Sequence, residues 1–411
     1  MYVYYGRKRL AMMKKLSVGI LLFMLTLVLQ QGKTEASEFV ITANQDRIPI
    51  YASPSGDFNE IGKLRLGESM IVTKSFDSDW WQVRFGNAHG YIEKNVVHLQ
   101  KNVEVPSENR QANTNKVVII NQDADVYDNS SGTLKKFAVV NEGNRYPVLS
   151  IYGNWWRIDV GGRVGFLHKS STSIDTGIPV LMYHHILTAE EKADSPYADR
   201  NSTTINTQFN EQMDYLKENG FTTISTEDLE AYLNGKINLP AKSVVLTLDD
   251  GNISSRVYAY PKLKELGFVA DQFIITGRTP EKPYIFDPQR LRFLSQQEMN
   301  EMSDVFNYYG HSHALHALTS SNESFLTAKD KEAVSMDLLY NRELLNDTTY
   351  FAYPFGQYNK DAIEIVRDVG FTMAYTTQMG RARLGINKLL IPRMGISPHL
   401  SIEEFAKRVN N

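Results

Sequence analysis

Residues 244–251 read VVLTLDDG, and this stretch decides the fold of the carboxyl-terminal half of the chain. Five of its first six residues are apolar or β-branched, which predicts a strand buried on both faces, as in a parallel sheet. Chemistry in parallel α/β folds collects at the carboxyl edge of the strands, where Asp249 and Asp250 are expected. Neighbouring side chains on a strand face different ways, so the two carboxylates can do different work, and Gly251 allows a sharp turn. The alternative is an ordinary Asp-Asp-Gly turn, and partners elsewhere in the chain decide between the two.

The composition is that of a globular protein, long enough for roughly two or three domains. The chain has 411 residues, a formal net charge of -3 and no cysteine. The weak net charge argues against a nucleic-acid partner. The absence of cysteine excludes disulfides, thiolate metal ligands and cysteine nucleophiles.

Residues 1–36 have the three-part plan of a secretory signal peptide. A basic lead precedes an apolar run over residues 16–29, and residues 34–36 offer a small-residue cleavage site. The run is short for a membrane span, so no stable span is expected after cleavage, although an uncleaved anchor is the alternative. Either way the rest of the chain is expected outside the cytoplasm, as a secreted or extracellular protein with cell-wall association as a further expectation.

Residues 37–175 contain an internal repeat. WWQV at residues 80–83 recurs as WWRI at residues 155–158, an offset of 155 − 80 = 75 residues. A period of this length fits one small domain per copy, and short β runs split by turn residues predict a small barrel. The expected domains cover residues 37–100 and 116–175, with a polar linker over residues 101–115.

The two copies resemble the bacterial SH3-like domains of cell-wall proteins. The resemblance rests on the paired tryptophans and on GYI at residues 90–92, which recurs as GFL at residues 165–167. It implies two small all-β SH3-like barrels that bind peptidoglycan or its peptides, with a spacer role as the alternative. One tryptophan of each pair is expected in the core and the other partly exposed.

From residue 178 to residue 411 the pattern changes to alternating strands and helices. Such alternation over about 230 residues predicts a parallel sheet, closed as a (β/α) barrel. Predicted strands cover residues 178–183, 222–225, 244–251, 268–276, 350–353, 373–376 and 389–396. Predicted helices cover residues 208–219, 227–234, 257–266, 295–306, 327–345 and 360–369, with a last helix capped by Ser401 and Glu404.

Six of the nine histidines lie in this last domain, at positions 184, 185, 311, 313, 316 and 399. His311, His313 and His316 come just after residues 308–310, where a strand is expected to end. Two imidazoles and a carboxylate are a common set for a catalytic zinc, and Asp250 with two of these histidines would make that set. His313 is the spare, an alternative ligand or a donor to a ligand. The other interpretation is a solvated loop that happens to be rich in histidine.

Residues 178–408 resemble the polysaccharide deacetylase family, carbohydrate esterase family 4. Its first motif, Thr-Phe-Asp-Asp-Gly, stands here as TLDDG at residues 247–251. Its paired histidines stand as His311 and His316, five apart instead of the usual four. The resemblance implies a distorted (β/α) barrel and reverses the interpretation of the aspartate doublet as a turn.

Two further segments narrow the resemblance to one subgroup. PVLMYHH at residues 179–185 opens the domain, and AYPFGQY at residues 352–358 follows the histidines. This arrangement is similar to the poly-β-1,6-N-acetylglucosamine deacetylases of biofilm formation. It implies a hydrolase of a carbon-nitrogen amide bond outside peptides.

The roles of the family carry over residue by residue. Asp250, His311 and His316 would bind a divalent metal, most often Zn²⁺. Asp249 would be the general base that takes a proton from the attacking water. The developing oxyanion would be held by the metal and by a backbone N–H near Tyr353 and Pro354.

The proton for the leaving amine would come from a histidine. His184 would supply it as imidazolium, because in this subgroup the acid histidine stands on the first strand of the domain. The alternatives are that His184 caps a core strand, or that His185 or His399 is the acid.

The chain departs from the family in two places. Tyr350 stands where the third motif usually has an arginine, and the usual Asp-Trp pair of the fourth motif is not visible. The group that orients Asp249 is therefore open. Arg393 is a candidate, and a structural ion pair is its alternative role. Residues 187–205 would line a sugar groove or form a solvated loop.

The expected function is that of a secreted, metal-dependent deacetylase acting on N-acetylglucosamine units of an extracellular polysaccharide. The catalytic subgroup favours poly-β-1,6-N-acetylglucosamine, and the repeats favour peptidoglycan. The other readings are a non-catalytic cell-wall-binding protein and a zinc hydrolase for wall peptides.

Overall fold

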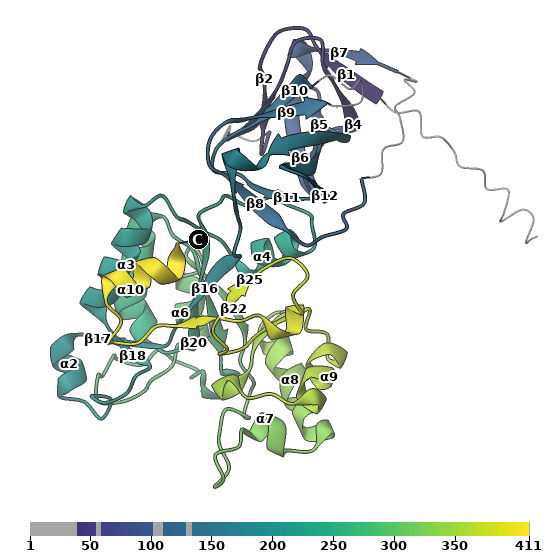
Figure 1. Ribbon diagram of the computed structural model, residues 1–411. Coiled ribbons are helices and arrows are strands. Elements are labelled where there is room, and N and C mark those ends of the chain that lie inside the picture. The colour runs from purple at the N-terminus through teal and green to yellow at the C-terminus, as the bar shows by residue number, and fades with distance from the viewer. Residues whose placement is uncertain (1–38, 55–58, 102–109, 129–133, 411) are drawn as a thin grey trace, which may run out of the picture.

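The computed structural model describes residues 39–54, 59–101, 110–128 and 134–410, which form an upper β-rich unit and a lower α/β domain (Figure 1). The expected signal peptide lies outside the described residues, as does most of the expected linker. Within the described ranges, no helix has the length and apolar character needed to cross a membrane.

The β-rich unit contains the two copies of the repeat. In the first copy the strands are β1 (Phe39–Ala43), β2 (Ile48–Tyr51), β3 (Glu60–Leu64), β4 (Ser69–Ser75), β5 (Trp80–Phe85), β6 (Ala88–Glu93) and β7 (Val97–Gln100). In the second copy they are β8 (Val117–Ile120), β9 (Ala124–Asp128), β10 (Lys135–Val140), β11 (Arg145–Pro147), β12 (Ser150–Tyr152), β13 (Trp155–Val160), β14 (Arg163–His168) and β15 (Thr172–Ile174).

The two copies are joined into one unit by strand pairing and by a shared hydrophobic cluster. Strands β3 and β10 pair antiparallel, so that twelve strands of both copies follow one another in a single sheet order. Gly62 permits the join, because a Cβ at this position would lie 2.6 Å from the Val139 carbonyl oxygen. The apolar residues of both copies also belong to one hydrophobic cluster. Pairing of two edges removes the unpaired backbone groups that each copy alone would expose.

The paired tryptophans divide their burial as expected. Trp80 and Trp156 are buried, whereas Trp81 and Trp155 are partly exposed. The buried member is the first of one pair and the second of the other. The contacts themselves repeat in both copies: Tyr51–Trp80 (ring centroids 5.7 Å apart) and Tyr127–Trp155 (5.5 Å), and the ammonium groups of Lys94 over Trp81 (4.5 Å) and Lys169 over Trp156 (4.7 Å).

The α/β domain begins with β16 and alternates strands with helices. Its strands are β16 (Ile178–Tyr183), β17 (His185–Leu187), β18 (Thr203–Ile205), β19 (Thr222–Thr223), β20 (Ser243–Asp250), β21 (Ala270–Ile274), β22 (Phe306–Gly310), β23 (Tyr350–Ala352), β24 (Met373–Tyr375), β25 (Arg381–Ala382) and β26 (Met394–Gly395). Its helices are α2 (Ala189–Ala193), α3 (Asn206–Glu218), α4 (Thr226–Leu233), α5 (Tyr260–Leu266), α6 (Gln296–Glu301), α7 (Phe325–Ala328), α8 (Lys331–Leu344), α9 (Lys360–Asp368) and α10 (Ile402–Val409).

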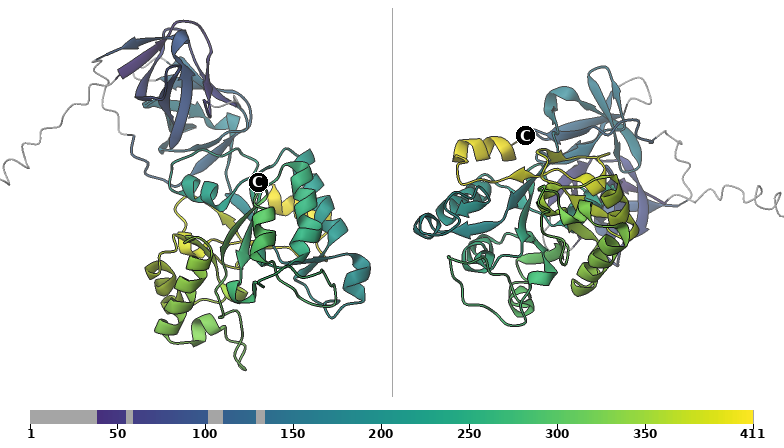
Figure 2. Two further views of the ribbon diagram at one scale, coloured as in Figure 1. Left: turned by 180° about the vertical axis from the view of Figure 1, so that it is seen from behind. Right: turned by 90° about the horizontal axis from the view of Figure 1, so that it is seen from below.

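The central strands form a parallel sheet that closes on itself. The order β16-β20-β21-β22-β23-β24 is parallel throughout. The chain then returns: Ile391 bridges to Tyr375 beside β24, and β26 pairs with β16. Helices α3 and α10 pack together on one side and α8 and α9 on the other (Figures 1 and 2). The predicted barrel is therefore present in the α/β domain.

Most predicted elements are confirmed, with three corrections. The predicted helix over residues 295–306 has its capping box at Ser295 but ends at Glu301, because Phe306 already begins β22. The predicted helix over residues 327–345 is split, because Asp330 caps α8 anew by accepting from the Ala333 amide. The predicted last strand is reduced to β26, preceded by a 3-10 turn.

Polar contacts fix the β-rich unit to the α/β domain. The buried Arg145 guanidinium pairs with Asp175 at 2.8 Å and donates to the Ala241 carbonyl. The Asn238 side chain donates to the Phe85 carbonyl at 2.8 Å. The junction lies near the amino-terminal end of β20, which leaves the carboxyl edge of the barrel open.

Candidate active site

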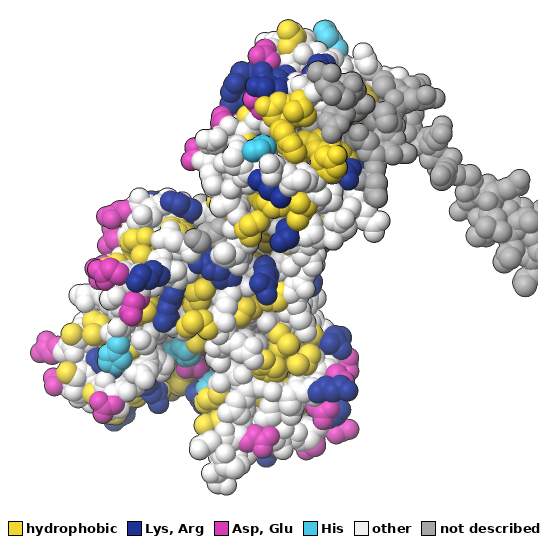
Figure 3. All heavy atoms as spheres, viewed as in Figure 1, with side chains coloured by type: hydrophobic (Ala, Val, Ile, Leu, Met, Phe, Trp, Pro, Cys, Tyr) yellow, Lys and Arg dark blue, Asp and Glu magenta, His cyan; other side chains and the backbone are white. Residues whose placement is uncertain are grey.

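The carboxyl ends of three neighbouring strands bring the predicted residues together. Asp250 at the end of β20 is in register with Ile274 of β21, which is in register with Gly310 of β22. His311 follows Gly310 directly. Histidine and acidic side chains gather in a notch at the lower edge of the α/β domain (Figure 3). The placement at the carboxyl edge agrees with the expectation from the sequence.

The strand β20 ends in a sharp turn that aims Asp250. Asp250 has a φ of 76° and Gly251 a φ of 72°, both in the left-handed region. Gly251 is needed at its position, because a Cβ there would lie 2.8 Å from the Ile274 Cδ1 atom. Asp250 is not a glycine and therefore carries backbone strain, a feature that concentrates at functional sites.

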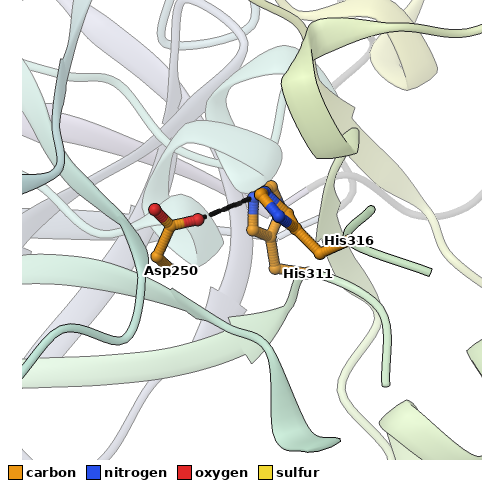
Figure 4. A group of neighbouring side chains, drawn as sticks. All are labelled: Asp250, His311 and His316. Carbon is orange, nitrogen blue, oxygen red and sulfur yellow. Dashed lines mark ion pairs between the residues drawn. The ribbon is translucent and has the colours of Figure 1, made fainter. Parts of the chain in front are cut away.

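Asp250, His311 and His316 converge in the way that a metal site requires (Figure 4). One ligand atom from each lies within 4.8 Å of the others. The Asp250 Oδ1 atom is 3.2 Å from His316 Nε2 and 3.6 Å from His311 Nε2. This Oδ1 is buried and has no hydrogen-bond donor among the described residues. A buried carboxylate oxygen without a donor, facing two imidazole nitrogens, fits a bound divalent cation.

The second nitrogen of His311 is held by the backbone. Its Nδ1 lies 2.7 Å from the Ala352 carbonyl oxygen, so it donates there. The Nε2 atom is then unprotonated and faces the site, as a metal ligand must be. Burial lowers the pKa of His311, and burial together with His311 lowers the pKa of His316 to about 3. Both rings are neutral at neutral pH.

His313 lies outside this group. Its Nδ1 is 3.0 Å from the Thr276 hydroxyl, and its ring packs against Tyr340 with centroids 4.7 Å apart. The sequence left two roles open for His313, a metal ligand or a donor to a ligand. The structure does not include His313 in the group of three ligand atoms.

Asp249 points into the barrel and meets Arg393. The guanidinium donates to both carboxylate oxygens, from Nη1 to Oδ1 and from Nη2 to Oδ2, each at 2.7 Å. Burial alone would raise the pKa of Asp249, but Arg393, with His311 and His184, lowers it well below its ordinary value. Arg393 thus occupies the position of the missing orienting group.

The three candidate acids lie in different surroundings. His184 is partly exposed, with Nε2 at 3.9 Å from Asp249 Oδ2. His185 is buried, its Nδ1 is 3.3 Å from the Thr203 hydroxyl, and burial together with Arg200 lowers its pKa to about 4. His399 is exposed on the segment before α10. Of the three, His184 is the one in contact range of Asp249.

The segment after β23 corrects one expectation about the oxyanion donor. The Tyr353 N–H donates to the Tyr375 carbonyl at 3.0 Å, because it continues the parallel ladder, and Pro354 has no N–H. Neither can supply the expected donor. The next residue, Phe355, has a φ of 57°, and its ring packs at a tilt against His316 with centroids 4.3 Å apart. Sequence reasoning passed over Phe355, although it follows Pro354 directly.

The loop between α2 and β18 is held by a buried lysine. Lys192 donates to the carbonyl of Tyr197, at 3.0 Å, and to the carbonyls of Ala198 and Arg200. The Tyr197 ring packs against His185, and its hydroxyl accepts from the Leu291 amide at 2.8 Å. The loop is therefore held by its own contacts, although most of its side chains over residues 193–201 are exposed, and both interpretations of residues 187–205 stay open.

Comparison with known proteins identifies the class. Residues 236–374 match the polysaccharide deacetylase family, so this chain contains a polysaccharide deacetylase domain. Enzymes of this class are hydrolases that act on amide bonds. The match includes Asp249, Asp250 and both histidines of the grouped site.

The individual relatives come from bacteria, and two of the three are named as deacetylases. The poly-β-1,6-N-acetyl-D-glucosamine N-deacetylase of Staphylococcus aureus is 26% identical over 216 residues, which is 51% of this chain and 72% of that protein. IcaB of Ammonifex degensii is 28% identical, with 57% of this chain and 98% of that chain covered and a TM-score of 0.49. The deacetylase PplD of Streptococcus pyogenes, solved with acetate, is 25% identical, with 57% and 99% covered and a TM-score of 0.49.

Proposed function

We propose that this protein is a secreted, metal-dependent N-deacetylase that removes acetyl groups from N-acetylglucosamine units of an extracellular polysaccharide. Its favoured substrate is poly-β-1,6-N-acetylglucosamine. The Staphylococcus aureus relative is named for this activity. Secretion rests on the signal-like pattern of residues 1–36. Each deacetylation would expose an amine that is cationic at neutral pH, and this would change the charge of the polymer.

One observation carries the proposal: the grouped atoms of Asp250, His311 and His316 lie beside an Asp249 that Arg393 holds in place. A divalent metal, most often zinc in sites of this composition, would act there as a Lewis acid that polarises a carbonyl and acidifies water. The three ligands leave positions open for substrate and water.

The remaining residues divide the proton transfers between them. Asp249 accepts a proton from the water that attacks the acetamide carbonyl carbon, and its ion pair with Arg393 keeps it ionised for this task. His184, whose Nε2 atom lies 3.9 Å from Asp249 Oδ2, gives a proton to the amide nitrogen as the carbon-nitrogen bond breaks. The products are acetate and a free amine. A charged amine leaves more readily than an amide anion, which is why an acid is needed.

The oxyanion requires a donor beside the metal ligands. We assign this role to the backbone N–H of Phe355, since the Tyr353 N–H is engaged and Pro354 has none. The contact of the Phe355 ring with His316 supports this assignment, because it brings the segment beside the proposed metal site. The left-handed backbone of Phe355 departs from the extended path of β23 and Tyr353, whose N–H points toward β24.

Acetate release from a panel of glycans tests the proposal. The panel contains β-1,6-linked and β-1,4-linked N-acetylglucosamine oligomers and intact peptidoglycan, with Asp249→Asn as the control. We expect release from the β-1,6 oligomers by the wild type and a large loss in the variant. Absence of acetate from every substrate by zinc-loaded protein would leave the non-catalytic reading.

Peptidoglycan is the second candidate substrate. The partly exposed Trp81 and Trp155 of the two copies favour it, because exposed aromatic side chains with a polar end suit binding surfaces. Sedimentation of the protein with purified walls would show this binding. Acetate release from peptidoglycan in preference to the β-1,6 oligomers would make it the substrate, and release of wall peptides without acetate would indicate a peptide hydrolase instead.

A further inference from the structure

The inner face of helix α8 carries two polar residues where an amphipathic helix usually buries apolar ones. Asp337 and Asn341 are one helical turn apart, and Asn341 is fully buried beside Val334 and Leu338. Burial of a polar side chain is unfavourable unless its hydrogen bonds are satisfied. The hydrogen-bond partners of these two side chains therefore show which neighbouring segment helix α8 stabilises.

Both side chains bind the backbone of the loop that carries the metal-binding histidines. Asp337 Oδ1 accepts from the His313 amide at 2.8 Å, and Asp337 Oδ2 accepts from the Ala314 amide at 2.7 Å. A carboxylate that accepts from two successive amides fixes the direction of the chain between them. His313 and Ala314 lie midway between the two proposed ligands, His311 and His316.

Asn341 holds the other end of the same loop. Its Nδ2 lies 2.9 Å from the Ser312 carbonyl oxygen, 2.9 Å from the Thr276 hydroxyl and 3.2 Å from the Ile274 carbonyl oxygen. It thus joins the loop to the end of β21, the strand beside Asp250. Gly310 is required next to it, because a Cβ there would lie 2.4 Å from Asn341 Oδ1.

The held loop contains a strained residue. Ser312 has a φ of 68°, in the left-handed region that non-glycine residues seldom adopt. Such a conformation persists when surrounding contacts determine it. The contacts around Ser312 include those of Asn341 and the Thr276 amide on its carbonyl, and those of Asp337 on the next two amides. Together they set the chain path that brings His311 and His316 to the same side.

We propose that Asp337 and Asn341 are positioning residues that preset the two histidines for a divalent metal, and thereby set the affinity of the site. The inference rests on the proposed metal site. In this role α8 stabilises the bound geometry before the metal arrives, so that binding does not have to order the loop. Removal of either contact lowers the affinity of the site for the metal, although neither side chain belongs to the proposed ligand set.

Equilibrium zinc affinity, measured by competition with a chromophoric chelator, tests this directly. Asp337→Asn keeps the shape but presents an N–H₂ group to an amide donor, and Asn341→Leu removes the contacts to the loop. We expect each variant to bind zinc roughly 10- to 100-fold more weakly than the wild type, as found when groups behind metal ligands are removed. Glu343→Gln, exposed on the same helix, is the matched control and should bind zinc like the wild type.

Thermal unfolding of the metal-free variants separates positioning from general stability. Wild-type zinc affinity in Asp337→Asn, with or without a lower unfolding temperature, would overturn the inference. If Asn341→Leu does not fold, Asp337→Asn decides alone. The outcome is independent of the substrate: weaker zinc binding in the variants of a protein that releases no acetate would keep the inference and remove the proposed function. Acetate release by the wild type, with unchanged zinc affinity in the variants, would keep the proposed function and remove the inference.

Discussion

The guanidinium of Arg393 donates to both carboxylate oxygens of Asp249, each at 2.7 Å, although the two residues are 144 positions apart in the chain. Arg393 lies on the returning segment that closes the barrel between Ile391 and β26. The closure of the fold and the orientation of the proposed base therefore depend on the same short segment.

Removal of Arg393 should destabilise the fold strongly. Arg393→Ala would leave the Asp249 carboxylate buried without its cation, and loss of one partner of a buried pair costs roughly 3–5 kcal/mol. Chemical denaturation should show this as a lower free energy of unfolding. Arg383→Ala, at an exposed arginine of the same region, should change it by less than about 0.5 kcal/mol. Equal stability of the two variants would contradict the importance of the pair.

A second buried carboxylate predicts a pH-dependent stability away from the site. Burial raises the pKa of Asp271 to about 7, although Thr226 and Asn307 donate to it. Between the ordinary pKa near 3.8 and about 7, the folded state holds a proton that the unfolded state has released. The protonated Asp271 therefore contributes its full stabilisation of the folded state below the ordinary pKa. This stabilisation is lost as the pH rises through about 7.

Asp271→Asn should remove this dependence. The free energy of unfolding of the wild type should fall between about pH 4 and pH 7, by at most roughly 4 kcal/mol. The variant should show a flatter profile over the same range in denaturant titrations. A wild-type stability that rises across this range in parallel with the variant would show that Asp271 is ionised throughout.

Variants of the proposed metal ligands should differ from a variant of His313 in the zinc that they retain. His316→Ala and Asp250→Ala should lose zinc that the wild type retains through gel filtration, because each removes one of three grouped ligand atoms. His313→Ala should retain it, since its ring contacts Thr276 and Tyr340 instead. Metal content by atomic spectroscopy measures the difference. Zinc lost from His313→Ala and kept by His316→Ala would exchange their roles.

The sequence predicted the site where chain order and residue type carry the information. The apolar run before Asp249 defines a buried strand, and the end of that strand fixes the edge at which Asp250 lies. His311 follows the end of a second strand in the same way. For these residues, strand ends and side-chain chemistry predicted a site of Asp250 with two of three histidines, and the family resemblance selected His311 and His316, which the structure groups with Asp250.

Contacts set by tertiary closure could not be predicted in this way. The Tyr353 N–H is engaged because β23 and β24 pair in one particular register, and no local pattern specifies that register. The left-handed conformations of Ser312 and Phe355 occur at residue types that carry no signal for them, whereas Asp250 is of a type that adopts this region more often. The joining of the two repeat copies depends on pairing between edges that lie far apart in the chain.

The identity of the acid is tested by comparison of three histidines. His184→Ala should lower kcat by roughly 10²–10⁴, the usual contribution of a general acid, and should keep its zinc because His184 is not among the grouped ligands. His399→Ala, at an exposed position, should leave kcat unchanged. His185→Ala should lower stability, because His185 is buried against Tyr197. Acetate release, metal content and thermal unfolding together separate the three effects, and a wild-type kcat for His184→Ala would transfer the role to another group.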